Sequence, residues 1–315
     1  MKRLQEFILV DWGTSNLRVW IMNAKGEPGK QAVSSMGADR LHPGQFYEVL
    51  KNILRDMGLP PAGEEKYPVI ICGMAGARTG WVEAGYMPVP VSCDQLVASP
   101  AHIETDELDV YILPGLAVRD EAVPDVMRGE ETQILGFCIR SPDFSGLLCL
   151  PGTHGKWVSM DRGVVTSFRT AMAGELFALL CGQSVIRHVI GDEVLFAPDH
   201  PDFKAGILEG YHHPQWILFD LFSVRARGVL FAAQGGQASA RLSGLLIGAE
   251  MSGSLKVHNQ ASPPVLIATG RMLLLYKQAF AYLGHEVACF DADLLVQDGL
   301  KIAAEKIFKM KGGVL

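Results

Sequence analysis

The fold of this chain is decided by its first hairpin, Phe7-Ile8-Leu9-Val10-Asp11-Trp12-Gly13-Thr14-Ser15-Asn16-Leu17-Arg18-Val19-Trp20-Ile21-Met22. The four apolar residues at its start are too few for a helix and predict a buried strand. The run Leu17–Met22 is rich in β-branched and aromatic residues, ends at a turn signal and predicts a second strand. We expect a third strand at about Gln31–Ser35. The sequence between the first two runs therefore joins two strands.

The turn of this hairpin has the composition of an anion-binding loop. Gly13, Thr14 and Ser15 offer backbone amides and hydroxyls to an anion, and the carboxylate of Asp11 beside them is a ligand type that Mg²⁺ accepts. A Walker loop would need Gly-x-x-x-x-Gly-Lys-Ser/Thr before a helix, and the sequence has no such string. One isolated copy of this pattern is also typical of an ordinary turn that contains an aspartate.

A second copy of the pattern favours the functional interpretation. It reads Gly146-Leu147-Leu148-Cys149-Leu150-Pro151-Gly152-Thr153-His154-Gly155-Lys156-Trp157-Val158-Ser159-Met160. Again an apolar run, a Gly-Thr pair, a basic residue and a second apolar run follow one another. Two such hairpins, one opening each half of the chain, indicate a duplicated α/β domain with a ligand between the halves.

The two hairpins resemble the phosphate hairpins of the actin–hexokinase–Hsp70 superfamily of ATP-binding proteins. Within it, the whole chain resembles the 2-dehydro-3-deoxygalactonokinase family of bacterial sugar-acid kinases. The closer match is carried by both hairpins and by Gly73–Arg78, Met127–Gln133, Gly174–Leu176 and Ser243–Glu250. It implies an α/β, two-lobed, duplicated ribonuclease-H-like fold of the actin/hexokinase type with a central inter-lobe cleft. We expect an N-terminal lobe of residues 1–137 and a C-terminal lobe of residues 138–315.

The resemblance also implies MgATP as phosphate donor, 2-dehydro-3-deoxy-galactonate as acceptor and its 6-phosphate as product. Asp11 is then the candidate Mg²⁺ ligand. The candidate ATP-binding residues are Gly13, Thr14, Ser15, Arg18, Gly152, Thr153, His154, Lys156, Gly270 and Arg271. Gly270 follows the predicted strand Val265–Ala268, where a glycine lets a flat ring approach the backbone. Arg271 stands where the family often has a second small residue, so both stacking on adenine and pointing away stay open.

The loop Gly73–Trp81 follows the predicted parallel strand Val69–Cys72, at the sheet edge where α/β proteins bind ligands. Arg78 in this loop can pair bidentately with a carboxylate, or it can form a salt bridge to a neighbouring loop. The resemblance favours the first alternative, because a sugar acid brings a carboxylate. Arg78 and Trp81 are therefore the candidate substrate residues.

Glu130 is the candidate general base. The second hairpin contains no acidic residue, and Gly129–Gly136 resembles the helix start that carries the base in glycerol-kinase-like members of the superfamily. Glutamate replaces the aspartate found there, which makes Glu131 the nearest competitor. A purely structural alternative is that both carboxylates complement the dipole of the helix that begins here.

Composition limits the classes of partner. The chain has 315 residues, a net charge of −6 and no basic stripe, which disfavours nucleic acid. No apolar stretch reaches the ~20 residues that span a bilayer, so we expect no membrane partner. Six cysteines without C-x-x-C spacing predict reduced thiols and a cytoplasmic location. Whether the chain forms a homo-oligomer stays open.

Two segments lack a clear pattern. We expect residues 83–108 to be mostly irregular, and residues 196–216, rich in Asp, His and Pro, to form a loop that faces the cleft. The remaining alternatives for function are a polyphosphate or nucleotide phosphohydrolase of the same superfamily and a kinase for another small sugar acid. A chaperone-like nucleotide-binding module would need a further peptide-binding domain, for which 315 residues leave no room.

Overall fold

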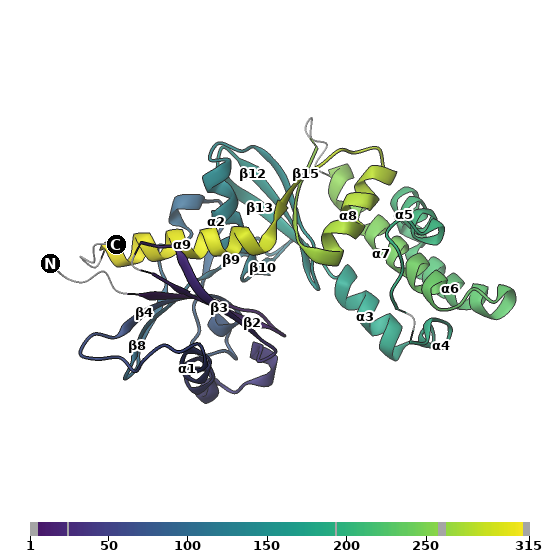
Figure 1. The fold of residues 1–315 in the computed structure, drawn as a ribbon. Helices are drawn as coiled ribbons and strands as arrows, with labels where there is room; N and C mark the ends of the chain where they lie inside the picture. Colours follow the sequence, from purple (N-terminus) through teal and green to yellow (C-terminus); the bar gives the residue numbers. More distant parts are fainter. Residues whose placement is uncertain (1–5, 24, 193, 258–262, 311–315) are drawn as a thin grey trace. The chain divides into compact units, whose positions relative to one another are not determined.

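The computed structural model describes residues 6–23, 25–192, 194–257 and 263–310, which form two compact units (Figure 1). Unit 1 comprises residues 1–144, 161–167 and 292–315, and unit 2 comprises residues 145–160 and 168–291. The expected lobe boundary after residue 137 thus falls inside helix α2 (Glu130–Arg140), and the C-terminal segment belongs with the N-terminal half.

Unit 1 is built on a six-stranded sheet in the order β3-β2-β1-β4-β8-β7. The strands are β1 (Phe7–Trp12), β2 (Leu17–Met22), β3 (Pro28–Ser34), β4 (Tyr67–Gly73), β7 (Ala101–Glu104) and β8 (Leu108–Ile112). β1 pairs antiparallel with β2 and parallel with β4, so the predicted hairpin is confirmed and lies beside a parallel strand. The four apolar residues before Asp11 are fully buried, as the core of an α/β sheet requires.

Helices α1 (Phe46–Asp56) and α9 (Ala292–Met310) pack on this sheet, and α2 packs on α9. α9 contacts α2, β1 and β4, which places the last helix in unit 1. Two glycines permit the close approach of α2 and α9. A Cβ at Gly136 would lie 2.0 Å from the Leu295 carbonyl oxygen, and one at Gly299 would lie 2.0 Å from that of Thr132.

The segment expected to be irregular contains short strands, so that prediction is wrong in part. β5 (Tyr86–Pro88) joins β9 (Gly115–Val118) and β10 (Asp125–Met127) in a three-stranded sheet. β6 (Val91–Ser92) pairs with the start of β13 (Val164–Ala171). The short 3₁₀ turns of this unit are η1 (Ala38–Arg40), η2 (Pro43–Gln45), η3 (Met74–Gly76) and η4 (Cys93–Gln95). The frequent prolines keep these strands too short for a periodic signal.

The prediction of reduced thiols is wrong for one pair of cysteines. Cys93 and Cys138 are joined by a disulfide bond, with Cα atoms 6.5 Å apart. The two residues are 45 positions apart and lie on η4 and α2, so neither spacing nor composition could pair them. Free thiols are found at Cys72, Cys149, Cys181 and Cys289.

Unit 2 repeats the strand plan of unit 1. Antiparallel β11 (Gly146–Leu150) and β12 (Gly155–Asp161) form its hairpin, and β11 pairs parallel with β14 (Val265–Ala268), which pairs parallel with β15 (Ala288–Asp291). An antiparallel hairpin beside parallel strands thus occurs in both units. The predicted duplicated α/β architecture is confirmed.

The α-helices of unit 2 are α3 (Ala173–Gln183), α4 (Arg187–Ile190), α5 (Pro201–His212), α6 (Ile217–Phe231), α7 (Gly236–Val257) and α8 (Gly270–Tyr282), and Pro214–Trp216 forms the 3₁₀ turn η5. Within the described residues, no helix is both long and apolar enough to span a membrane.

Helix α5 contradicts the prediction of a loop at residues 196–216. Pro201 fits the first turn of a helix, and the His200 side chain accepts a hydrogen bond from the Asp202 amide at 3.1 Å. Glycines that look like helix breakers lie at the contact with α7 instead. A Cβ at Gly210 would lie 2.3 Å from the Leu245 carbonyl oxygen, so the two helix backbones approach as closely as glycine allows.

Candidate active site

The turn between β1 and β2 is a compact loop held by backbone hydrogen bonds. The Gly13 amide donates to the Asn16 carbonyl at 2.9 Å, and the amide of Ala38 donates to the Gly13 carbonyl at 3.0 Å. A Cβ at Gly37 would lie 2.2 Å from the Thr14 carbonyl oxygen, so the following segment can reach the loop because residue 37 is glycine. Thr14 and Ser15 are exposed at the tip. Their hydroxyls and amides are therefore accessible to a ligand.

Asp11 on β1 and Arg18 on β2 are opposite each other in the antiparallel register of this hairpin. The Arg18 Nε and Nη2 atoms donate to Oδ2 of Asp11 at 2.9 and 2.6 Å. Arg18 Nη1 donates to Asp293 on the first turn of α9. Two carboxylates thus hold one guanidinium. Burial raises the pKa of the Asp11 carboxyl, and the charge and hydrogen bonds of Arg18 oppose that rise.

The Cys72 thiol lies between Asp11 and the start of α2. Its Sγ donates to Oδ1 of Asp11 at 3.6 Å, and β-pairing sets Cys72 directly beside Asp11. Burial, together with the carboxylates of Asp11 and Glu131, raises the pKa of this thiol well above its usual range. The Cys72 side chain is therefore an uncharged thiol that fills space in the core. Its position shows that Asp11 on β1 and the start of α2 lie in the same region of unit 1.

The two glutamates at the start of α2 have different surroundings. Glu130 is half-buried, and its Oε2 accepts from the Arg128 amide at 3.2 Å. Glu131 is 1% exposed, and its oxygens accept from the Gly129 amide at 2.6 Å and the Thr132 hydroxyl at 3.1 Å. Burial, and then the charge of Glu130, raises the pKa of Glu131 to about 8. Glu131 is therefore neutral at pH 7, and Glu130 is the more accessible carboxyl group.

The predicted substrate residues follow β4 but differ in exposure. Arg78 is exposed, and it has no ion pair among the residues that the structure describes. Trp81 packs on Phe46, with ring centroids 6.3 Å apart, and belongs to the wall of the core. Arg128 is not among the predicted site residues. Its guanidinium lies 4.3 Å from the ring centre of Tyr86 and donates to the Ala84 carbonyl.

The turn of the second hairpin is held by hydrogen bonds from α3 and from Lys156. His154 hydrogen-bonds to Glu175 on α3, and the Glu175 amide donates to the Thr153 carbonyl at 3.0 Å. Lys156 is 4% exposed, and its Nζ donates to the His154 carbonyl at 2.7 Å. These contacts hold the turn, while Thr153 stays exposed and a Cβ at Gly152 would meet open space. The turn thus offers its glycine–threonine tip to solvent.

A buried glutamate, Glu250, contacts the second strand of this hairpin. Oε1 of Glu250 accepts from Trp157 Nε1 at 2.8 Å, and Oε2 accepts from the Tyr276 hydroxyl at 2.9 Å. Burial raises the pKa of Glu250, and both donors oppose the rise. A Cβ at Gly155 would lie 3.3 Å from Oε1, so the hairpin strand rests directly on this carboxyl group. The role of Glu250 is to position the hairpin.

The predicted adenosine loop lies at the start of α8. Gly270 has a φ of +55°, a conformation that favours glycine, and a Cβ there would meet open space. Arg271 Nη1 donates to the Phe196 carbonyl at 3.0 Å, and its guanidinium lies 4.6 Å from the centre of the Phe196 ring. In this structure Arg271 therefore packs on Phe196, beside an open glycine surface.

The sequence profile of the 2-keto-3-deoxy-galactonokinase family matches residues 11–303. The chain belongs to this family. The match begins at Asp11 and continues into α9, so it includes the turns of both hairpins and all the candidate site residues named above.

Relatives agree with this membership over nearly the whole length. The chain is 35% identical to the 2-dehydro-3-deoxygalactonokinase of Escherichia coli (strain K12) over 96% of this chain and 98% of that protein. It is 37% identical to a probable 2-dehydro-3-deoxygalactonokinase of Rhizobium meliloti (strain 1021), with the same coverage. The crystal structure of a candidate enzyme of this kind from Sinorhizobium meliloti superposes with a TM-score of 0.90 at 37% identity, covering 96% and 99% of the two chains.

A more distant likeness concerns the fold alone. The activator of 2-hydroxyisocaproyl-CoA dehydratase from Clostridium difficile, solved with bound ADPNP, has a TM-score of 0.50 at 10% identity over 99% of this chain. Together with the family match, this agrees with the predicted actin/hexokinase-type fold.

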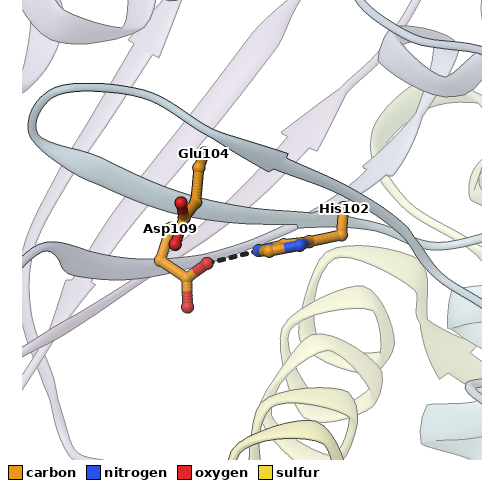
Figure 2. A group of neighbouring side chains, drawn as sticks. All are labelled: His102, Glu104 and Asp109. Carbon is orange, nitrogen blue, oxygen red and sulfur yellow. Dashed lines mark hydrogen bonds and ion pairs between the residues drawn. The ribbon is translucent and has the colours of Figure 1, made fainter.

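A cluster of potential metal ligands lies elsewhere in unit 1, on the β7–β8 hairpin. Figure 2 shows Glu104 beside His102 and Asp109, whose Nε2 and Oδ1 atoms are 2.6 Å apart. The His102 ring also stacks on Tyr111, and the Tyr111 hydroxyl donates to Asp109 at 3.2 Å. Strand β4 separates this hairpin from β1 in the sheet. The cluster is thus held by its own hydrogen bonds and is separate from the Asp11 site.

Glu131 predicts a characteristic pH dependence of stability. Its pKa in the folded chain is about 8, against ~4.3 for an unperturbed glutamate. The folded state therefore binds the proton more tightly, and this stabilisation is complete below pH ~4.3 and is lost as pH rises through about 8. Glutamine cannot ionise, so the free energy of unfolding of Glu131→Gln minus that of the unmodified chain should rise from pH 5 to pH 9, by on the order of a few kcal/mol. Urea unfolding of both proteins at pH 5 and at pH 9 measures this difference. A difference that is the same at the two pH values would contradict the raised pKa of Glu131.

Proposed function

We propose that this chain transfers the γ-phosphoryl group of ATP to the 6-hydroxyl of 2-dehydro-3-deoxy-galactonate. The observation that carries the proposal is the 35% identity to the Escherichia coli 2-dehydro-3-deoxygalactonokinase over 96% of the chain. The site chemistry agrees, since phosphoryl transfer depends mainly on positioning and on stabilising negative charge. Two amide-rich turns, a cation and carboxylates supply those elements here.

Each phosphate hairpin has a distinct task in this proposal. Thr14 and Ser15 at the first turn and Thr153 at the second bind phosphate oxygens through amides and hydroxyls. Arg18 pairs with Asp11, which directly precedes the first turn, so its guanidinium supplies positive charge beside that turn. Lys156 supports the second turn from within, and Gly270 offers its open surface to the adenine ring.

The contacts of Asp11 are suited to Mg²⁺. Arg18 occupies Oδ2, whereas Oδ1 receives the weak thiol donor of Cys72 at 3.6 Å, which a cation can displace. Mg²⁺ takes one or two protein carboxylates together with substrate phosphates. Asp11 would hold the ion, which would supply positive charge to neutralise the phosphates. A divalent cation would also favour the ionised form of Asp11, against the effect of burial on its pKa.

Arg78 neutralises the substrate carboxylate in this proposal, and it predicts a selective mutant. Arg78→Ala should raise the Michaelis constant for the sugar acid by roughly 30- to 150-fold, since a charge-assisted hydrogen bond contributes about 2–3 kcal/mol. The constant for ATP should stay nearly unchanged. Arg55→Ala, which removes another exposed arginine of unit 1, is the control and should alter neither constant. An effect confined to ATP would exclude Arg78 from the acceptor site.

The activity itself is tested by ADP release from the purified chain with and without sugar acid. Release that depends on 2-dehydro-3-deoxy-galactonate supports the kinase. Equal release in both samples overturns it and favours the phosphohydrolase. A panel of 2-oxo-3-deoxy sugar acids then identifies the acceptor, because one misplaced polar contact separates epimers.

A further inference from the structure

Helix α6 in unit 2 has an apolar face directed away from the core. Val224 and Gly228 face inward, and a Cβ at Gly228 would lie 2.3 Å from the Val189 side chain. The opposite face, which we call the outer face, consists of Leu218, Phe219, Phe222, Ala226, Val229 and Leu230. At 100° per residue these six positions form one continuous stripe along the helix. A surface helix normally carries polar residues there.

The outer face is large for an exposed apolar patch. Its five large side chains are 62–78% exposed. With about 150–250 Å² for a full aromatic side chain and less for leucine and valine, the five expose roughly 500–700 Å². The largest apolar patch on a typical monomer is about 300–600 Å², whereas a stable interface covers about 800 Å² on each partner. The face alone therefore approaches the size of a complete interface.

The order of residues on the outer face points to a second copy of the same helix. The six positions are symmetric about residue 224, since 218 pairs with 230, 219 with 229 and 222 with 226. An antiparallel copy related by a two-fold axis at residue 224 would set Phe222 opposite Ala226, and Phe219 opposite Val229. Large side chains thus oppose smaller ones, which lets two helix faces interlock. A self-complementary patch is what a two-fold dimer requires.

We propose that the chain forms a two-fold symmetric homodimer in which α6 of each copy packs antiparallel on α6 of the other through the outer face. No acidic or basic residue belongs to the face, so it closes without burying a charge. Arg225 lies at its margin and is half-buried. The candidate phosphate-binding hairpins lie on other elements, so the proposal is independent of the proposed function.

The test compares two leucine-to-glutamate variants of the full chain. Leu218 lies on the outer face and is 78% exposed, while Leu274 on α8 of the same unit is 55% exposed and is the matched control. By sedimentation equilibrium, the unmodified chain and Leu274→Glu should show twice the 34.2 kDa chain mass at micromolar concentration. Leu218→Glu should weaken dimerisation on the order of 100-fold, because it buries two unpaired carboxylates.

Two results would overturn this dimer. One is an unmodified chain that sediments at 34.2 kDa over the whole concentration range, which would leave the face to a different partner. The other is an unmodified chain that does form a multimer, but one whose dissociation constant is the same for Leu218→Glu. Both exchanges are made at exposed positions, and circular dichroism verifies that each variant is folded. Ala226→Glu repeats the test on the smaller side of the Phe222 contact, where the same loss is expected.

Discussion

Asp11→Asn is expected to lower turnover by roughly 10²–10³-fold and to raise the Mg²⁺ concentration needed for half-maximal rate. A metal ion supplies several kcal/mol of charge stabilisation in phosphoryl transfer, and a neutral amide cannot balance the divalent ion. The fold should tolerate this exchange. Burial already raises the pKa of Asp11, which means that the charged form is the costly one, and an asparagine oxygen still accepts from Arg18.

The matched control for this prediction is Asp293→Asn. Asp293 also pairs with Arg18, but it lies on α9 and not on the strand that leads into the phosphate turn. If Asp11 acts through the metal, a magnesium titration should shift in Asp11→Asn and stay in place in Asp293→Asn. If Asp11 serves only to hold Arg18, the two variants should behave alike. Superimposable magnesium curves for Asp11→Asn and the unmodified chain would remove Asp11 from the metal site.

Sequence reasoning predicts the two hairpins well because their signals are local. The apolar run before Asp11 is buried on both faces of the sheet, and the second run pairs with it in register from Phe7–Met22 to Trp12–Leu17. The same holds for the second hairpin. In both, the strand period and the turn composition agree, so the pattern has few alternatives.

The misplaced elements are those whose structure depends on distant contacts. The composition of residues 196–216, rich in Asp, His and Pro, predicts a loop. Helix α5 forms there instead, and its Gly206 and Gly210 allow α7 to approach. The predicted C-terminal lobe, residues 138–315, includes α9. Its place in unit 1 rests on the glycine contacts with α2, which no local period reveals.

The candidate site shows the same limit at the level of single residues. The sequence identifies Asp11 and Arg18 through the hairpin, but Asp293, 275 positions from Arg18, has no pattern that links it to them. Lys156 and Arg271 are both candidate ATP-binding residues, and for Arg271 stacking on adenine and pointing away both stay open. The structure places Lys156 against the His154 carbonyl and Arg271 against Phe196, so the type of residue could be predicted but not its partner.

The two glutamates of α2 differ in ways that only packing reveals, and this difference makes a prediction about catalysis. A general base must be ionised and reachable by the substrate hydroxyl. Glu131 is sealed from solvent, both its oxygens already accept hydrogen bonds, and its pKa of about 8 keeps it protonated at pH 7. Glu130 is half-buried at the first position of the helix, where the dipole favours a carboxylate.

Glu130→Gln should therefore lower turnover by about 10²–10⁴-fold, the contribution of a positioned base, with the Michaelis constant for ATP nearly unchanged. Glu131→Gln is the matched control, since it removes a neighbouring carboxyl group of the same length. Its turnover at pH 7 should fall less than about tenfold, because the group it replaces is already neutral. Steady-state rates of the two variants at saturating sugar acid decide between the carboxyl groups. If Glu130→Gln retains near-normal turnover while Glu131→Gln loses it, the base is Glu131, and its proton must leave before the substrate binds.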